Sequence, residues 1–250
     1  MVTCLEDIKN IFYINLDHRT DRKDHVESQL SKIGLQRFQR FSAIKMENGA
    51  IGCSMSHLKL LQLALKSGLD HILIVEDDIE FLDLNLFRVQ LNRFLKAQQK
   101  KGSLWDVILF AGNNMPPYTI IDDTCVKVSH CQTTTGYLVN GHYIEKLINN
   151  IRTGLTNLLR NPEKHLLYAI DMYWISLQKS DQWVLITPLT VVQRDDYSDI
   201  EKKVVHYQKA MTDLDKAEIM EKMKANEEYN LEKRLYEEMM AKFRGRMTKG

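Results

Sequence analysis

Short apolar runs alternate with amphipathic segments along the first 200 residues of this 250-residue chain. The runs at 11–16, 72–75, 105–110 and 183–188 are brief and rich in β-branched or aromatic residues, which is typical of buried strands. Between them, apolar residues recur at helical spacing, and Gly68 marks where one such helix ends. Strands that alternate with helices predict an α/β domain in which helices flank a central, mainly parallel sheet.

The helix before the run at 72–75 has two candidate N-terminal caps, Ser54 and Ser56. Gly52, which precedes them, would allow another backbone segment to approach closely. Further helices are expected after the first strand, over 84–100 and over 166–180.

The last 50 residues have a different composition. Glu201–Gly250 holds 22 of the chain's 67 charged residues, about twice the charge density of 1–200. Apolar residues there keep a four-residue step, at Leu231, Leu235, Met239 and Phe243. We therefore expect a first domain over 1–200 and a long, charged amphipathic helix over 201–250. This helix either packs on its own domain or on a second copy, as a homodimer contact, or remains a solvated tail.

Charge, cysteines and hydropathy exclude several classes of protein. The net charge of +1 gives no nucleic-acid footprint, and no apolar run approaches the roughly 18 residues of a membrane span. Cys4, Cys53, Cys125 and Cys131 form no CxxC pair, which favours reduced thiols, with a Cys125–Cys131 bridge as the alternative. The first ten residues lack the apolar core of a signal peptide. We expect a soluble, intracellular protein, although a chain cut from a longer protein would look the same.

Three carboxylates, Glu76, Asp77 and Asp78, follow the run at 72–75 directly. Adjacent carboxylates raise one another's pKa unless a cation or strong donors hold them. In an extended segment, Glu76 and Asp78 would share one face and Asp77 would point to the other. Glu76 and Asp78 would then make a hard-oxygen site for Mn²⁺ or Mg²⁺, completed by a bound diphosphate. The alternative is that one carboxylate caps the next helix while the others are solvated.

Polar residues also follow the first strand, namely Asn15, Asp17, Arg19 and Arg22. Open α/β sheets bind ligands at the C-terminal ends of their strands, where these residues lie. An arginine can fork onto phosphate oxygens, and an aspartate can accept from ribose or uracil donors. A solvated helix start is the alternative. The chain contains neither GxxxxGK[ST] nor GxGxxG, which argues against a P-loop ATPase and a dinucleotide fold.

Six segments of the chain, in this order, resemble glycosyltransferase family 25, which includes bacterial lipooligosaccharide galactosyltransferases and collagen hydroxylysine galactosyltransferases. The segments are FYINLDHRTDRKDHVESQL, GCSMSHLKLLQLAL, HILIVEDDIEF, TTTGYLVNGHYIEKLI, AIDMYW and QRDDYSDI. The resemblance runs from about Ile11 to Ile200, and the last 50 residues fall outside it.

The resemblance implies a GT-A-like nucleotide-binding fold that transfers a hexose from a UDP-sugar with inversion. Galactose is the first expectation for the sugar and glucose the second, and the acceptor would be a hydroxyl of a glycan or of hydroxylysine in a collagen-like chain. Glu76 and Asp78 would hold the Mn²⁺ (or Mg²⁺) of the family's metal motif, with Asp77 on the substrate. Inverting transfer needs a base that takes the acceptor's proton, and no covalent intermediate.

Asp171 is the candidate base, because it matches an acidic position of the family and Tyr173 and Trp174 beside it could desolvate it. An exposed aspartate with core aromatics is the alternative, and Asp195 and Asp196 are rival candidates.

Ser56 and His57 match a GCxxSH segment of the family, where a helix N-terminus would attract phosphate or sugar hydroxyls, unless His57 is a structural hydrogen bonder. Thr135 and Gly136 would line the donor-sugar pocket or form a strand edge. His206 is a candidate for completing the metal shell.

Two other classes of function compete with this interpretation. An inactive glycosyltransferase-like scaffold would act through the C-terminal helix, but it predicts a disrupted acidic triad, and 76–78 is intact. A metal-dependent phosphatase or nucleotidyltransferase would use the same carboxylates without sugar transfer.

Overall fold

An eight-stranded sheet forms the centre of the fold in the computed structural model, which describes residues 2–102, 105–198, 202–227 and 230. Its strands, in spatial order, are β2 (Phe38–Ser42), β1 (Ile11–Asn15), β3 (His71–Glu76), β10 (Gly136–Asn140), β5 (Val107–Leu109), β11 (Trp183–Ile186), β8 (Cys125–Lys127) and β7 (Thr119–Asp122). β10 and β8 each run antiparallel to both neighbours, and the other six strands share one direction. The predicted α/β fold with a mainly parallel central sheet is confirmed.

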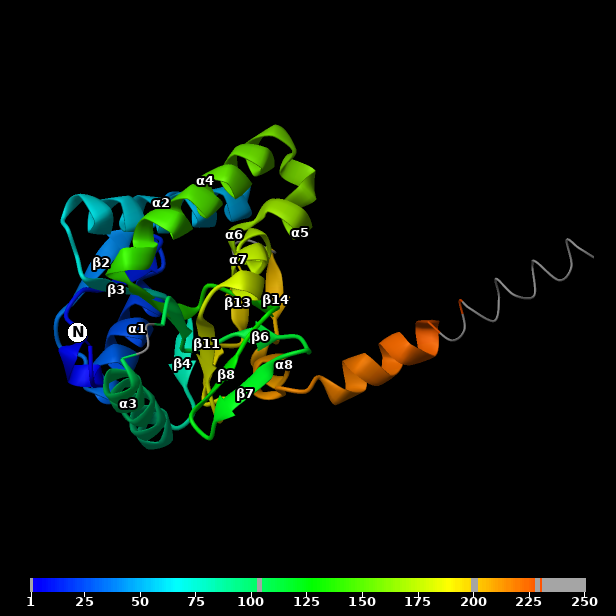
Figure 1. Cartoon of the computed structure of the whole chain (residues 1–250). Coiled ribbons are helices and arrows are strands. Elements are labelled where there is room, and N and C mark those ends of the chain that lie inside the picture. The colour runs from blue at the N-terminus through cyan, green and yellow to red at the C-terminus, as the bar shows by residue number, and fades with distance from the viewer. Residues whose placement is uncertain (1, 103–104, 199–201, 228–229, 231–250) are drawn as a thin grey trace, which may run out of the picture. The chain divides into compact units, whose positions relative to one another are not determined.

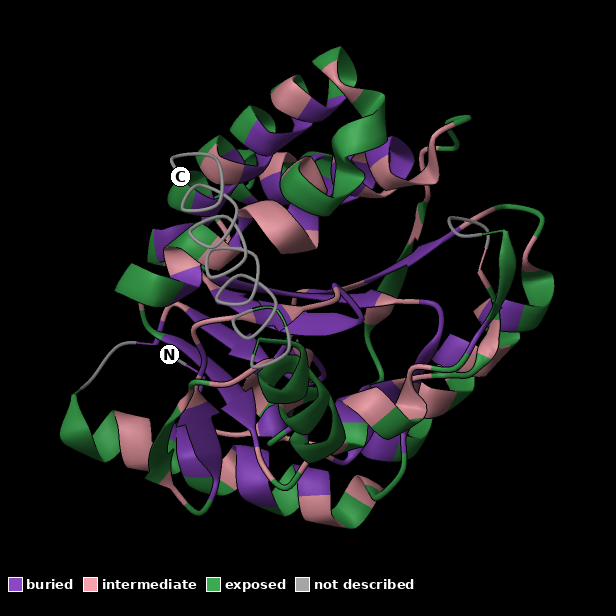
Figure 2. Ribbon diagram, turned by 90° about the vertical axis from the view of Figure 1, so that its right-hand side faces the viewer, coloured by how far each residue is buried: buried purple, intermediate pink, exposed green. Residues whose placement is uncertain are grey.

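Helices cover both faces of this sheet (Figure 1). One layer holds α2 (Gly49–Lys66) and α4 (Ile144–Arg160), which pack on each other, and the other holds α1 (Thr20–Ile33) and α3 (Leu84–Lys101). Successive residues of β3 alternate between the layers, with Ile72 and Ile74 in the first core and Leu73 and Val75 in the second. Figure 2 shows the sheet buried between the two layers. β3 therefore reads as a continuous apolar run because both of its faces are covered.

The helix before β3 begins earlier than predicted. Its N-terminal cap is Asn48, whose side-chain oxygen accepts from the backbone N–H groups of Ala50 (3.0 Å) and Ile51 (3.3 Å). Ser54 and Ser56 lie inside the helix, so their prediction as caps is wrong. An asparagine cap outside the apolar repeat carried the start signal instead.

The segment 166–180 was predicted as one helix, and this is wrong. It forms three short helices, α5 (His165–Tyr168), α6 (Ile170–Tyr173) and α7 (Ile175–Ser180). Ala169 has extended backbone geometry (ψ 153°) and breaks the first from the second. Trp174, between the second and third of these helices, is fully buried, and its indole N–H donates to the Cys131 carbonyl at 3.1 Å.

Small strand pairs bring the segment after β11 back to the end of β3. β4 (Ile79–Phe81), which directly follows the three carboxylates, pairs with β12 (Val191–Gln193), and β13 (Asp196–Ser198) pairs with β14 (Lys203–Val205). The remaining elements are η1 (Leu5–Asp7), β6 (Asn113–Asn114), β9 (Cys131–Gln132), η2 (Gly141–Tyr143), η3 (Pro162–Lys164) and α8 (Gln208–Thr212).

The chain divides into compact units at 1–214 and 215–250. β14 and α8 belong to the first unit. Because residues 203–205 form the strand β14, the predicted C-terminal helix does not begin at 201. Residues 217–227 of the second unit are helical. The apolar series from Leu231 to Phe243 lies outside the described residues, so the helix there and its homodimer contact stay predictions.

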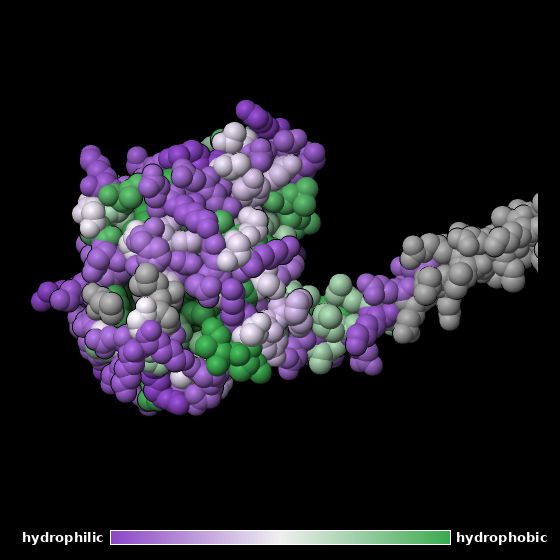
Figure 3. Space-filling view, in the orientation of Figure 1, coloured by the Kyte–Doolittle hydropathy of each residue, from purple (hydrophilic) through white to green (hydrophobic). Residues whose placement is uncertain are grey.

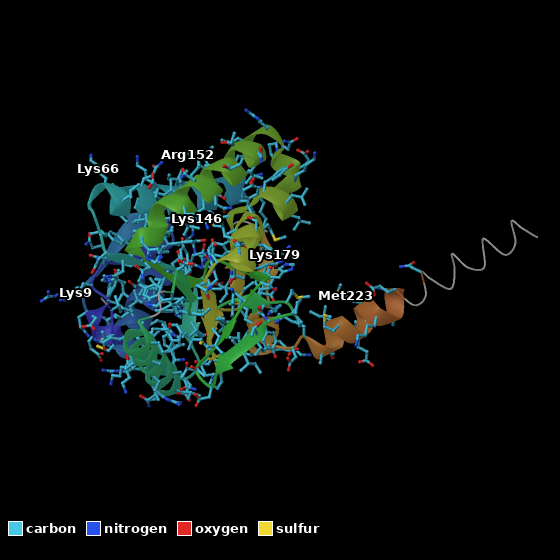
Figure 4. All side chains as sticks on the ribbon, in the orientation of Figure 1. Lys9, Lys66, Lys146, Arg152, Lys179 and Met223 are labelled. Carbon is cyan, nitrogen blue, oxygen red and sulfur yellow. The ribbon has the colours of Figure 1, made fainter. Side chains whose placement is uncertain are left out.

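The four cysteines are free, as expected, with Cys125 and Cys131 buried. Among the described helices, none has the length and apolar character needed to cross a membrane. The surface is mixed in character: exposed apolar side chains gather at β7 (Ile120, Ile121) and α5 (Leu166, Leu167) (Figure 3). Figure 4 labels basic side chains on several elements, including Lys66 on α2, Arg152 on α4 and Lys179 on α7.

Gly52→Ala should destabilise the fold, because a Cβ at Gly52 would lie 2.4 Å from the backbone oxygen of Ile44. We expect the free energy of unfolding, measured by urea denaturation, to fall by about 1–3 kcal/mol. Lys59→Ala, an exposed site on the same helix, is the control and should change it by less than about 0.5 kcal/mol. A Gly52→Ala variant as stable as the wild type would contradict the close packing of α2 on the 44–46 segment.

Candidate active site

A cavity of about 370 Å³ opens where β1 and β3 end. Its walls come from the ends of these strands, the first turns of α2, the 43–49 segment before that helix, and residues near β12, β13 and β14. Glu76, Asp77 and Asp78 all line it, together with Arg22 of α1. The position at the C-terminal ends of parallel strands is the one that α/β sheets use for ligands.

The three carboxylates do not alternate as predicted. β3 ends at Glu76, and Asp77 and Asp78 form a turn before β4, so the two-residue periodicity stops at the first carboxylate. Asp77 and Asp78 contact the same arginine, whereas Glu76 contacts α2. The extended geometry on which the shared face of Glu76 and Asp78 was predicted is therefore absent, although both residues line the cavity.

Arg22 supplies a positive charge to this turn. Its Nη1 donates to Asp77 Oδ1 at 2.9 Å, its Nη2 donates to Asp78 Oδ2 at 3.1 Å, and its Nε lies 3.4 Å from Asp196 Oδ2. Asn15 donates to the other oxygen of Asp77 at 2.8 Å. Burial nevertheless raises the pKa of Asp77 above its usual range. The buried guanidinium therefore joins α1, the end of β3 and β13.

Asp78 is buried and incompletely satisfied. Its Oδ2 accepts from Arg22 and, at 3.0 Å, from Gln193, but its Oδ1 has no hydrogen-bond partner among the described residues. Burial and the neighbouring charge of Glu76 raise the pKa of Asp78 to about 7. An orphaned carboxylate oxygen beside a polar cavity fits a hard divalent cation, because such ions take oxygen ligands and favour the ionised carboxylate.

Glu76 lies in a different environment, at the base of α2. Its Oε1 accepts from Thr134 (2.8 Å) and lies 3.2 Å from His57 Nε2 and 3.6 Å from Cys53 Sγ. Burial acts to raise the pKa of Glu76, but the bonds from His57 and Thr134 outweigh it, and the pKa is lowered. Among the described residues, Cys53, His57 and Glu76 bring potential metal-ligand atoms within 4.8 Å of one another, and this group does not include Asp78.

His57 and Ser56 line the cavity, but away from any helix N-terminus. His57 is fully buried and its Nδ1 lies 2.8 Å from the Tyr137 hydroxyl. Ser56 Oγ donates to the Gly52 carbonyl and accepts from the Ile44 N–H, both at 2.8 Å. Because α2 begins at Gly49, neither residue presents unpaired backbone N–H groups, and the anion-binding argument from a helix start is wrong.

Of the four site residues predicted after β1, two line the cavity and two do not. Asn15 and Arg22 line the cavity, whereas Asp17 and Arg19 do not. Asp17 accepts from Arg40 (2.5 Å) and Ser42 (2.7 Å) on β2.

Arg19 pairs with Asp21 (2.9 Å) and with Asp196 (3.1 Å). Thr135 and Gly136 also lie outside the cavity lining: the Thr135 carbonyl accepts from the Glu76 N–H at 2.9 Å, and Gly136 pairs with Val75 across the sheet.

Asp171 lies near the Glu76 end of the site without lining the cavity. Its Oδ2 accepts from the backbone N–H of Thr133 at 3.2 Å. Burial raises the pKa of Asp171, the Thr133 N–H offsets part of the rise, and the charge of Glu76 adds to it. Thr133 has φ +76°, an unfavourable geometry for a β-branched residue, and its N–H is the one aimed at Asp171.

The two rival candidates for the catalytic base, Asp195 and Asp196, both contact other side chains. Asp196 accepts from Arg19 and Arg22; burial acts to raise its pKa, but the Tyr197 N–H and Arg22 lower it below its usual range, which makes it a weak base. Asp195 Oδ2 lies 3.1 Å from Nδ1 of the exposed His206, which does not line the cavity.

Several lining residues were not predicted as site residues from the sequence. They are Lys45, Met46, Cys53, Gln193, Ser198 and Lys202. The two lysines lie in irregular or hairpin segments, and no ion pair joins either to another described residue. Only contacts between distant segments could have placed them beside the carboxylates.

The fold is an α/β domain with a cavity at the C-terminal ends of its parallel strands, and comparison with known sequences gives its family. The sequence model of glycosyltransferase family 25, described as an LPS biosynthesis protein, matches residues 45–174, just over half of the chain. The chain belongs to glycosyltransferase family 25.

Relatives in insects are distant and longer. A Drosophila pseudoobscura pseudoobscura protein named glycosyltransferase 25 family member is 26% identical over 165 residues, covering 53% of this chain and 26% of that protein. An Aedes aegypti protein of the same name is 22% identical over 173 residues, covering 56% and 28%. The chain thus spans about a quarter of the length of these relatives.

Two solved structures share low similarity with the chain. A glycosyltransferase involved in glycosylation of the major capsid of PBCV-1 is 11% identical with a TM-score of 0.39, covering 82% of this chain and 88% of that one. A Drosophila galactosyltransferase in complex with manganese, UDP-Gal and xylobiose is 15% identical with a TM-score of 0.30, covering 56% and 52%.

Asp78→Asn should stabilise the metal-free protein at alkaline pH. Because the folded state holds the Asp78 proton up to about pH 7 and the unfolded state releases it near pH 4, the folded form loses stability as pH rises between these values. We expect the variant to be more stable than the wild type by about 1–2 kcal/mol at about pH 8, and equal to it near pH 4, by urea denaturation in EDTA.

Asp21→Asn is the matched control. The bond from Arg19 lowers the pKa of the exposed Asp21 to about 2, so its contribution is present above pH 4 and its removal should not stabilise the protein at pH 8. A pH-independent difference between Asp78→Asn and the wild type would contradict a raised Asp78 pKa.

Proposed function

We propose that this chain transfers a hexose from a UDP-sugar to a hydroxyl acceptor, with inversion and with the help of a divalent metal ion. The observation that carries the proposal is the cavity at the end of β3, which combines three carboxylates with Arg22 in a family 25 chain. Its volume of about 370 Å³ lies within the roughly 300–1,000 Å³ range of small-molecule sites.

The donor's diphosphate would lie between opposite charges. Lys45 and Lys202 line the cavity and can approach phosphate oxygens, while Arg22 is held by Asp77 and Asp78 at its wall. Asn15 lines the same wall and can orient a ribose or base edge. These groups would bind and position the donor before transfer.

Asp78 and Glu76 would hold the metal ion, Mn²⁺ first and Mg²⁺ second. Asp78 Oδ1 is an acceptor without a partner in the described part of the chain, and Glu76 lines the same cavity with its pKa lowered. When bound, such an ion neutralises the charge that develops on the departing UDP. The Arg22 guanidinium favours the ionised form of Asp78 and would orient it toward that position.

Asp171 would be the base that takes the acceptor hydroxyl's proton. A raised pKa brings a carboxylate nearer to the working pH, and the Thr133 N–H fixes one of its oxygens. Asp196, with its pKa lowered by the Tyr197 N–H and Arg22, would instead hold the arginine in place. The acceptor would then approach from the Thr133 side of Glu76.

Family membership supports galactose as the sugar, with glucose as the next candidate, and a glycan or collagen-like hydroxylysine as the acceptor. An inactive scaffold that acts through its C-terminal helix is the alternative. Donor binding separates the two, because a scaffold has no need of metal-dependent binding of UDP.

Calorimetric titration of UDP should give binding in Mn²⁺ that disappears in EDTA. Asp78→Asn should weaken it by about tenfold or more, because the carboxylate that faces the ion is lost. Asp123→Asn, an exposed carboxylate between β7 and β8, is the control and should bind as the wild type does. Wild-type protein that ignores UDP in the presence of Mn²⁺ would favour the scaffold.

Asp171→Asn should lower kcat by about 10²–10⁴-fold while leaving UDP affinity unchanged, because the amide can still accept from Thr133 but cannot take a proton. UDP release from UDP-galactose and UDP-glucose, with glycans and collagen-like peptides as acceptors, measures this. Asp196→Asn tests the rival: a larger fall in kcat there, with full activity in Asp171→Asn, would reassign the base.

A further inference from the structure

The Glu76 end of the site has a different donor chemistry from the Asp78 end. Cys53 and His57, one helical turn apart on α2, both face Glu76, and their sulfur, nitrogen and oxygen atoms lie within 4.8 Å of one another. Thiolate, imidazole and carboxylate together suit Zn²⁺ and related borderline-soft ions, whereas Mn²⁺ and Mg²⁺ favour sites made of oxygen.

The spacing of these atoms already approaches that of a tetrahedral site. Zinc bonds of about 2.3 Å to sulfur and about 2.0–2.2 Å to nitrogen and oxygen place S and O about 3.6 Å apart, and N and O about 3.4 Å apart. The corresponding distances are 3.6 Å from Cys53 Sγ to Glu76 Oε1 and 3.2 Å from His57 Nε2 to the same oxygen. Two of the three distances therefore already approach those of a zinc site, and the third, from Cys53 Sγ to His57 Nε2, lies within 4.8 Å.

Tyr137 supports the histidine from behind. The second nitrogen of His57, Nδ1, lies 2.8 Å from the Tyr137 hydroxyl, and the two rings stack with centroids 5.6 Å apart. Metal-binding histidines usually donate from their second nitrogen to such a partner, which fixes the ring and its tautomer. A hydroxyl can rotate to accept from Nδ1–H when Nε2 binds a metal ion, and can donate to Nδ1 when Nε2–H faces Glu76.

The cluster also borders the cavity and is held on its other side by a hydrogen bond. Cys53, His57 and Glu76 all line the 370 Å³ cavity, which provides an entry path and room for a further ligand. Thr134 donates to Glu76 at 2.8 Å and can keep the carboxylate oriented. Without an ion, the Cys53 thiol and the His57 ring direct donors at one carboxylate oxygen.

We propose that Cys53, His57 and Glu76 form a binding site for Zn²⁺ and related thiophilic divalent ions, separate from the hard-oxygen position at Asp78. Binding releases the thiol proton and forms a metal–thiolate bond, with no change of oxidation state. Because the site uses Glu76, occupancy would withdraw this carboxylate from Mn²⁺. This consequence predicts that Zn²⁺ inhibits sugar transfer, and it is the one part of the inference that rests on the proposed function.

Titration of the protein with Cd²⁺, a spectroscopic stand-in for Zn²⁺, tests the site without any nucleotide. A thiolate-to-metal charge-transfer band should appear in the ultraviolet and reach its maximum at one equivalent of Cd²⁺. Zn²⁺ should displace the Cd²⁺ and remove the band. Cys53→Ser should abolish the band, whereas Cys4→Ser, which alters a thiol outside the cavity, should keep it. Tyr137→Phe should retain the band and weaken Cd²⁺ binding by about 10–100-fold.

No band in the wild type, or a band that survives Cys53→Ser, would overturn the inference. Thermal melts of each variant show whether it folds, and the wild-type titration decides the question even where a variant does not fold. The outcome is independent of donor binding: a Cd²⁺ band in a protein that ignores UDP would remove the proposed function and leave this site. Donor binding without a band would do the reverse.

Discussion

The rest of the site depends on the buried ion pairs that the guanidinium of Arg22 makes with Asp77 and Asp78. β3 leaves the core through a turn in which Asp77 and Asp78 are both buried, and one arginine from α1 holds both. Removing Arg22 would leave both carboxylates buried without a cation, and leaving a buried charge uncompensated in this way typically costs about 3–5 kcal/mol. The same arginine reaches Asp196, so the hairpin after β12 is held beside the carboxylates.

This arrangement divides the carboxylates into two environments. At the Arg22 end, Asp78 has an oxygen that no described residue contacts by a hydrogen bond and a pKa near neutrality, as expected of a group that awaits a hard cation or remains protonated without one. At the α2 end, Glu76 stays ionised among donors from His57, Thr134 and Cys53. One cavity therefore presents oxygen ligands on one side and a mixed sulfur, nitrogen and oxygen set on the other, which is how it could discriminate between classes of metal ion.

The sequence was most informative where a pattern is local. The apolar run at 72–75 predicted β3, and the three carboxylates predicted where the cavity lies. The predicted alternation of the three carboxylates was wrong because β3 stops at Glu76. The end of this strand is set by its pairing with β1 and β10 rather than by its own residues. The start of α2 was predicted wrongly because its N-terminal cap, Asn48, lies outside the apolar repeat. Lys45, Lys202 and Gln193 could not be predicted, because only the tertiary fold brings them to β3.

A crystal structure grown with UDP and Mn²⁺, in which anomalous scattering locates the metal ion, tests the proposed donor site most directly. We expect Mn²⁺ against Asp78 Oδ1 and the diphosphate, with the uridine in the cavity that Asn15 and Lys45 line. UDP bound elsewhere on the protein, or a diphosphate in this cavity that contacts Arg22 and the lysines with no ion beside Asp78, would contradict the proposed site.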